Sequence, residues 1–391
     1  MRTIIKASLA SAVLLACVSG LGYKIFQART IAATVKPTFS TPACPKPTRG
    51  QVQCHAAVVS DARTRMKRTS RTPSGYGPTQ FRTAYNLPHR PPTPQTVYIV
   101  DAFDAPNIEQ DLKIYSAAFG LPPCTTANGC FTKIKVGNPA YNAGWEMETS
   151  LDVQIVHALC KRDCKIVLIE ANSNSYADML AAIDKAVSLG ATIVSNSWGS
   201  GEFSSQTSSS IDGHFNHPGV VFTFSSGDAG YGVAYPAASK YVTAVGGTTL
   251  TLNADNTRAS ETAWSGSGSG CSLYESKPTW QKDTGCSNRT VADVSAAADP
   301  ATGAAIYNSN AGGWLKVGGT SLAAPIIASI YALAGNASAT NYGSYPYAHK
   351  GRFFDVTSGT NGTCSPAYLC SGVTGFDGPT GLGAPVGRLG F

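Results

Sequence analysis

The sequence has few charged residues. Asp, Glu, Lys and Arg make up 14% of its 391 residues, against about 25% in an average soluble protein. It has no Cys-x-x-Cys pair, which argues against a zinc site built on such a pair. Its N-terminal apolar run, residues 7–22, is shorter than the roughly 20 residues of a membrane-spanning helix. With 43% apolar residues, the chain can build one large core or two domains. Its 40 glycines are typical of a secreted protein with many turns.

The N-terminal region carries much of the basic charge. Arg2 and Lys6 precede the apolar run, so residues 1–28 are predicted to be a signal peptide of a secreted, extracellular protein. A lipoprotein anchored at Cys17 is the minority alternative. Residues 29–74 are rich in Pro, Thr and Arg without a period that would build a core, and we interpret them as a short basic propeptide or linker of a zymogen. Because their basic residues are not interleaved with aromatic ones, we expect no nucleic-acid binding.

A regular pattern begins at Gly75, so we expect the mature chain to start close to that residue.

Ten cysteines remain when Cys17 is set aside, and this even number predicts disulfides formed in an oxidising compartment. The sequence does not fix their connectivity, and pairing between near neighbours is the simplest arrangement. These neighbours are Cys44 and Cys54, Cys124 and Cys130, Cys160 and Cys164, Cys271 and Cys286, and Cys364 and Cys370.

Apolar strands alternate with amphipathic helices in the first half of this region. The alternation predicts an α/β fold with a mainly parallel β-sheet that helices cover on both faces. The expected strands are 96–101, 165–170, 192–195, 220–225 and 241–245, and the expected helices are 108–119, 145–159, 176–189 and 322–334. Residues 252–311 are rich in Gly and Ser, and we expect them to be irregular. We treat residues 75–391 as a single catalytic domain.

One motif places a serine at the start of a helix. Gly318 and Gly319 permit a sharp turn, and an alanine-rich apolar helix follows Ser321. Backbone N–H groups and the helix dipole favour negative charge at such a position, which suits attack on a carbonyl group. Pro325 is expected in the first turn, where its missing N–H matters little. A glycine turn followed by a serine N-cap is the structural alternative.

Acidic residues form a second feature. Glu148 and Asp152 are four residues apart on a predicted helix, so their carboxyl groups lie on one face. In a confined site such a pair retains a proton and titrates as a unit, and it can then serve as a general base oriented by a second acid. A solvated acidic helix face is the alternative.

Asp228 follows a buried strand on a glycine turn. It either forms the turn or, when protonated, donates a hydrogen bond to an oxyanion.

These motifs together resemble those of the sedolisin, or serine-carboxyl peptidase, family, which has a subtilisin-like fold. Glu148-x-x-x-Asp152 is similar to its Glu–Asp pair, and Gly319-Thr320-Ser321-x-x-x-Pro325 to its nucleophile motif. Ser226-Gly227-Asp228 resembles the segment with its oxyanion acid. The resemblance implies a serine-type endopeptidase that acts in acid on proteins or peptides. It also implies that the segment with Ser197, Trp198 and Gly199 lines the substrate cleft.

The resemblance further implies one structural Ca²⁺ near the C-terminus. Its ligands are the carboxylates of Asp355 and Asp377 and the carbonyl oxygens of Val356, Val373 and Gly375, a set that suits calcium. The chain departs from the family at Val373, where glycine is usual, and in its short N-terminal segment. Two aspartates that cap turns are the alternative.

Two other functions stay open at this stage. The chain lacks the His-Gly-Thr-His motif that supplies the base in subtilisins, so a histidine-dependent hydrolase would need an unrecognised base. A catalytically silent relative used for binding or adhesion is the second alternative, which the complete set of four candidate catalytic residues disfavours. Asp101 is interpreted as support of the cleft and His157 as a core residue. We expect a monomer without a stable membrane span.

Overall fold

The computed structural model of the protein describes residues 39–88 and 92–391. The expected signal peptide, the alternative lipid site at Cys17 and the first part of the expected propeptide lie outside the described residues. No helix in the described part has the length and apolar character needed to cross a bilayer.

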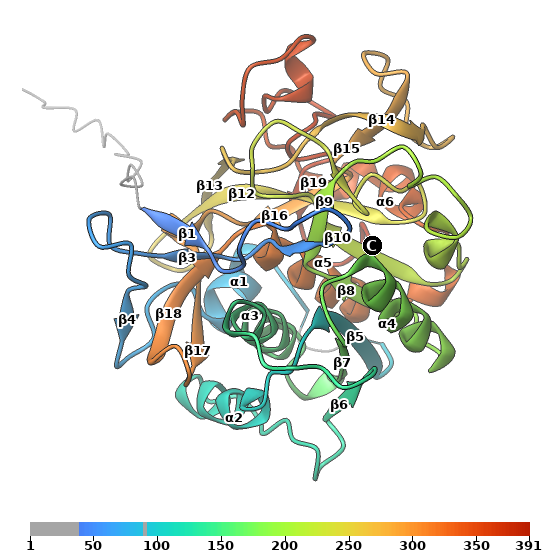
Figure 1. Ribbon diagram of the computed structural model, residues 1–391. Coiled ribbons are helices and arrows are strands. Elements are labelled where there is room, and N and C mark those ends of the chain that lie inside the picture. Colours follow the sequence, from blue (N-terminus) through green and yellow to red (C-terminus); the bar gives the residue numbers. More distant parts are fainter. Residues whose placement is uncertain (1–38, 89–91) are drawn as a thin grey trace, which may run out of the picture. The chain divides into compact units, whose positions relative to one another are not determined.

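An eight-stranded sheet forms the centre of the fold (Figure 1). All of its strand pairs are parallel except that of β12 with β13. In spatial order the strands are β13 (Arg258–Ala263), β12 (Thr243–Leu252), β10 (Val221–Ser225), β8 (Ile193–Asn196), β5 (Gln95–Ala102), β7 (Cys164–Ala171) and β6 (Phe131–Lys135), and β16 (Val294–Ala297) also pairs with β12.

Helices cover both faces of this sheet. Side chains alternate along a strand, so Val97 and Ile99 of β5 join one core cluster while Tyr98 and Val100 join the other. The first cluster contains α3 (Ala143–Cys160) and α5 (Thr320–Ala334), and the second contains α4 (Tyr176–Ser188) (Figure 1). The predicted α/β fold class is confirmed.

The remaining elements are shorter. The other α-helices are α1 (Pro78–Ala84), α2 (Ile108–Ala118) and α6 (Ser344–Ala348). The 3₁₀ helices are Lys161–Asp163, Asp212–Phe215, Pro300–Thr302, Ala337–Ala339, Lys350–Arg352 and Ala367–Leu369. A five-stranded sheet contains β1 (Ser40–Pro42), β3 (Ala57–Val59), β4 (Thr69–Ser70), β17 (Ala304–Asn308) and β18 (Gly313–Gly318). A three-stranded sheet contains β2 (Gln53–Cys54), β9 (Trp198–Gly201) and β11 (Ala234–Tyr235). Two pairs of strands complete the set: β14 (Gly270–Ser276) with β15 (Asn288–Val291), and β19 (Phe353–Phe354) with β20 (Ala384–Pro385).

Two expectations about irregular segments were wrong. Residues 252–311 contain β13 to β17. Short strands of Ala, Ser and Thr give little periodic signal, and pairing with neighbours such as β12 fixes them instead. The segment 29–74 was expected to lack core residues, yet Val52 and Val58 are fully buried. Its apolar residues pack against distant parts of the chain, so no local period reveals them.

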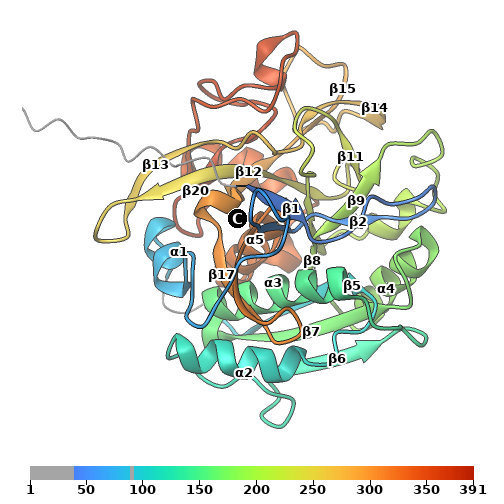
Figure 2. The ribbon, with the colours of Figure 1, turned by 60° about the vertical axis from the view of Figure 1, so that its left-hand side comes forward.

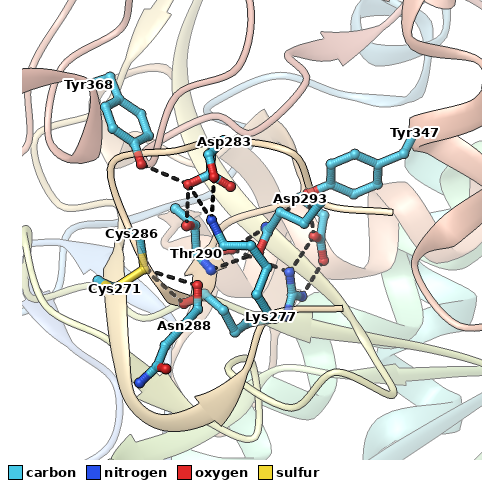
Figure 3. A network of polar contacts seen from close by, with 11 residues as sticks. Cys271, Lys277, Asp283, Cys286, Asn288, Thr290, Asp293, Tyr347 and Tyr368 are labelled. Atoms are coloured by element: carbon cyan, nitrogen blue, oxygen red, sulfur yellow. Dashed lines mark hydrogen bonds and ion pairs between the residues drawn. A yellow bond between two sulfur atoms is a disulfide. The ribbon is translucent and has the colours of Figure 1, made fainter. Parts of the chain in front are cut away.

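A polar network fixes the β14–β15 region and the start of β12 (Figure 3). The buried guanidinium of Arg289 forms an ion pair with Asp293 at 2.5 Å, and Tyr347 donates to the same carboxylate at 2.7 Å. Asp293 Oδ2 also accepts the N–H of Ala244 in β12 at 2.8 Å. Because the charge of Arg289 is paired within a hydrogen-bonded network, its burial is tolerated.

The cysteines pair as near neighbours, as expected. The five disulfides are Cys44–Cys54, Cys124–Cys130, Cys160–Cys164, Cys271–Cys286 and Cys364–Cys370.

Candidate active site

Ser321 is the second residue of α5. Gly319 precedes the helix with a φ of 98°, a conformation that favours glycine. Pro325 lies in the second turn rather than the expected first one. A proline there cannot donate to the carbonyl of residue i−4, which is Ser321. Ser197 Oγ lies 3.3 Å from that carbonyl oxygen. Ser197, the residue after β8, therefore contacts the start of α5 at the carbonyl that the proline leaves without an intrahelical donor.

Helix α3 brings the acidic pair to the same place. Ser321 Oγ donates to Glu148 Oε2 at 2.9 Å, although the two residues are 173 positions apart in the chain. Asp152, one turn later, accepts from Ser197 Oγ at 2.8 Å. Ser321, Glu148 and Asp152 have no exposed surface. The structure thus brings a serine and two buried carboxyl groups into one hydrogen-bonded cluster.

Burial favours the protonated form of these acids. It raises the pKa of Glu148 well above its usual value, and the neighbouring Asp152 and Asp101 raise it further. The pKa of Asp152 is raised in the same way, by burial and then by Asp101. Burial also raises the pKa of Asp101 to about 7. Three acids in one low-dielectric region cannot all ionise, so the cluster retains protons at mildly acidic pH.

Asp228 approaches Ser321 from the turn after β10. Its Oδ1 accepts hydrogen bonds from the N–H and the hydroxyl of Thr320, at 2.7 and 2.8 Å. Desolvation raises the pKa of Asp228 to about 7, although both bonds from Thr320 act in the opposite direction. The second oxygen, Oδ2, lies beside Gly319: a Cβ on this glycine would stand 2.5 Å from it. Sequence reasoning missed Thr320, whose contacts orient the carboxyl group.

Of the segment 197–199, Gly199 lines the cavity beside Asp228, and Trp198 is buried beneath it. Trp198 has no exposed surface, and its Nε1 donates to Val100 O at 3.0 Å. The indole therefore anchors strand β9 to the central sheet. Gly199 lines a cavity of about 540 Å³ together with Gly227 and Asp228.

The histidines that the structure describes do not take part in the Ser321 cluster. His157 is buried and contacts Pro122 O at 3.0 Å, which agrees with a role in the core. His55, for which the sequence indicated no role, lies in the cleft. Its Nδ1 is 2.7 Å from Ser225 Oγ, and burial lowers its pKa to about 4. Among the histidines within residues 39–88 and 92–391, none has a hydrogen bond to Ser321.

The candidate calcium residues gather in the loops between β19 and β20. Asp355 accepts the N–H of Gly375 at 2.9 Å, and Asp377, fully buried, accepts that of Val373 at 3.0 Å. In the described part of the chain, no hydrogen bond reaches the carbonyl oxygens of Val356, Val373 or Gly375. Carboxylate and backbone carbonyl oxygens are the ligand types that Ca²⁺ takes, so the chemistry of these residues fits that ion.

The parallel sheet and the serine at the start of α5 define a protein of the subtilisin-like class. A profile described as "Subtilase family" matches residues 142–344, and the chain belongs to this family. Within it, the chain is a sedolisin-type member. It is 28% identical to Sedolisin of Pseudomonas sp. (strain 101), over 80% of this chain and 60% of that protein. It is 30% identical to Kumamolisin of Bacillus sp. (strain MN-32), over 81% of this chain and 63% of that protein. The chain therefore spans less than two thirds of the length of these relatives.

A solved structure shows the same likeness. Pseudomonas sedolisin (serine-carboxyl proteinase), complexed with two molecules of pseudo-iodotyrostatin, superimposes with a TM-score of 0.70 at 29% identity. The match covers 81% of this chain and 96% of that chain. The resemblance inferred from the sequence motifs is confirmed.

Proposed function

We propose that the protein is a secreted serine-carboxyl endopeptidase that hydrolyses peptide bonds in acid. Ser321 is the nucleophile, Glu148 the base and Asp152 the acid that shares its proton with Glu148. Asp228 is the oxyanion donor. The observation that carries the proposal is the 2.9 Å hydrogen bond from Ser321 Oγ to Glu148 within a buried carboxyl cluster.

The chemistry follows from these positions. Ser321 Oγ attacks the substrate carbonyl carbon while its proton passes to Glu148. Asp228, protonated below its pKa of about 7, donates a hydrogen bond to the developing oxyanion. The amine product leaves with the proton from Glu148. Water then attacks the acyl-enzyme, Glu148 takes its proton, and Ser321 regains a hydrogen as the acid product departs.

The alternatives have less support. The silent binding protein would not need a serine, a base, a second acid and an oxyanion acid in one cluster. The histidine-dependent hydrolase would need a histidine that bonds to Ser321, whereas within residues 39–88 and 92–391 the side chain that accepts from Ser321 Oγ is Glu148.

Replacement of Asp228 by asparagine tests the oxyanion role. The asparagine side chain keeps an N–H donor that does not titrate, but its amide does not fit the two hydrogen bonds from Thr320 as the carboxyl group does. We therefore expect the rate at acid pH to fall by up to about 100-fold. The wild-type rate should fall as pH rises through about 7, the pKa of Asp228, and the variant should lose this fall. Steady-state hydrolysis of a peptide across pH measures both effects.

Glu275 provides the matched control, because burial also raises its pKa to about 7 and its carboxylate contacts Gln206 rather than the cluster. Glu275→Gln should leave the pH profile unchanged. An Asp228→Asn profile that superimposes on the wild-type profile would contradict the assignment.

We also propose that Asp355 and Asp377, with the carbonyl oxygens of Val356, Val373 and Gly375, bind one structural Ca²⁺. The ion neutralises two acids that otherwise repel and fixes the C-terminal loops. Burial raises the pKa of Asp377 to about 7, with a smaller contribution from Asp355, and ligands must be deprotonated to hold the metal.

Chelation is therefore expected to lower the melting temperature near neutral pH, where the carboxylates ionise, and added calcium should restore it. Asp377→Ala should remove this calcium dependence. Asp255→Ala, at an exposed turn, should retain it. Equal melting temperatures for calcium-loaded and chelated wild type would mean that Asp355 and Asp377 only cap turns.

The remaining features of the proposal concern the whole molecule. We propose that the protein is exported, that its N-terminal segment is removed on activation, and that it acts on proteins or peptides as a monomer. The disulfides support an oxidising compartment.

A further inference from the structure

Strand β2 shows how an extended peptide can lie against β9. The two strands pair antiparallel, with Cys54 opposite Trp198 (Figure 2). The next residue, His55, donates its N–H to Ser197 O at 3.1 Å. A substrate peptide that adds to the same edge of β9 would gain the same backbone hydrogen bonds, which is a common way for proteins to bind extended chains.

The position of His55 along this edge is the one that the proposed reaction uses. A Cβ on Gly319 would stand 1.9 Å from His55 O and 2.5 Å from Asp228 Oδ2, so the carbonyl oxygen at this position lies beside the candidate oxyanion acid. The N–H of the following residue, Ala56, donates to Glu148 Oε2 at 2.9 Å, the oxygen that accepts from the candidate nucleophile. A substrate in this register therefore places the residue before the cleaved bond where His55 lies.

The side chain at this position meets the hydroxyl of Ser225. His55 Nδ1 lies 2.7 Å from Ser225 Oγ, which belongs to the last residue of β10. Ser225 has no exposed surface, and within residues 39–88 and 92–391 its hydroxyl has no other hydrogen-bond partner. The imidazole also packs against the backbone of Gly199, since a Cβ there would stand 3.1 Å from His55 Cε1.

A buried hydroxyl is costly to leave without a partner. When a substrate replaces His55, Ser225 bonds either to the side chain of that substrate or to water. The cavity of about 540 Å³ that His55 also lines is large enough to admit water. A substrate side chain with a polar atom at the right place satisfies the hydroxyl directly, whereas an apolar side chain leaves it unpaired or must share the pocket with a water molecule.

We propose that Ser225 is a specificity-determining residue and that the enzyme favours histidine or asparagine immediately before the cleaved bond. The inference rests on the proposed function and names its substrate class. In both side chains a nitrogen or oxygen is bonded directly to Cγ, which is the place from which His55 Nδ1 reaches Ser225. The hydroxyl both donates and accepts, so it serves either tautomer of the imidazole and either end of the amide.

Asparagine is the sharper probe of this contact. Burial lowers the pKa of His55 to about 4, so in acid a histidine that enters the pocket must first lose its proton. The amide of asparagine does not titrate, and leucine has nearly the same shape with carbon in place of both polar atoms. The comparison of asparagine with leucine therefore measures the hydrogen bond to Ser225 without a cost of deprotonation.

The test uses two peptides that differ only in the residue before a single cleavable bond, asparagine in one and leucine in the other. We measure kcat/KM for both at one acid pH with the processed wild-type enzyme and with Ser225→Ala. Wild type should favour the asparagine peptide. Because one hydrogen bond in a pocket that admits water contributes about five- to tenfold, the ratio of asparagine to leucine should fall by that factor in the variant.

Ser295→Ala is the matched control. Ser295 is a buried serine of β16 in the same sheet as Ser225, and it lies outside the residues that line the cleft cavity. Its substitution should leave the ratio unchanged.

A second readout needs no variant, so it holds even if Ser225→Ala does not fold. Wild type digests a denatured protein in acid, and mass spectrometry identifies the residue before each cut. Relative to the abundance of each residue, histidine and asparagine should precede the cuts more often than leucine.

The outcomes separate this inference from the proposed function. An equal ratio of asparagine to leucine in wild type and Ser225→Ala, or cuts that favour leucine, would overturn the role of Ser225 and leave the proposed function standing. Hydrolysis that persists in a folded Ser321→Ala chain, or a folded wild type that cleaves neither the peptides nor the denatured protein, would contradict the proposed function and this inference with it.

Discussion

Replacing Ser321 with alanine is expected to abolish peptide hydrolysis, with any remaining rate below about a thousandth of wild type. The hydroxyl is the only group on this side chain that can form the acyl bond, and its hydrogen bond to Glu148 is the first proton path. Alanine removes one buried oxygen from a helix that stays packed. We therefore expect the melting temperature to change little while kcat falls.

Ser329→Ala is the matched control. Ser329 is buried in the same helix and its hydroxyl donates to Pro325 O at 2.7 Å, so the substitution makes the same chemical change away from the cleft. It should keep nearly full activity. A correctly folded Ser321→Ala chain that retained a substantial fraction of the wild-type kcat would rule out Ser321 as the nucleophile.

Glu148→Gln is expected to have the second largest effect. Glutamine has nearly the same shape and still accepts a hydrogen bond from Ser321, but it does not take up the proton. General-base catalysis contributes about 10²- to 10⁴-fold, so we expect kcat to fall by at least about 100-fold. KM should change less, because glutamine keeps nearly the same side-chain shape in the cleft.

Glu146→Gln serves as the control on the same helix. Glu146 is almost fully buried and accepts from Asn310 Nδ2 at 2.8 Å, outside the Ser321 cluster. Its substitution should change stability more than kcat. Equal losses of kcat in the two variants would mean that any lost carboxylate in α3 disturbs the helix, and the assignment of Glu148 as the base would fail.

Much of the fold could be predicted because its signals are local. The apolar run at residues 96–101 became β5, and the amphipathic pattern at residues 176–189 became α4 with nearly the same ends. Fully buried parallel strands read as continuous apolar runs, which few other structures produce. The strands between residues 258 and 308 were missed because they are rich in small residues and are defined by their partners.

The candidate site was foreseen in its residues more than in its arrangement. Motifs on α3, after β10 and at α5 were recognised separately, and only the tertiary fold brings them within hydrogen-bonding distance. The role of Thr320 as partner of Asp228 was not foreseen. The pairing of β2 with β9 and of β3 with β18 was not foreseen either, because strands of two and three residues that pair with distant parts of the chain leave no periodic pattern.

The central claim is that carboxyl groups, rather than histidine, handle the proton of Ser321. The pH dependence of kcat/KM for the processed wild-type enzyme tests it most directly, since it reports the essential acid and base of the free enzyme. We expect a maximum in acid and a fall as pH rises through about 7, where Asp228 ionises. A rate that instead rises through about 6.5, the usual pKa of histidine, and stays maximal at mildly alkaline pH would contradict the claim.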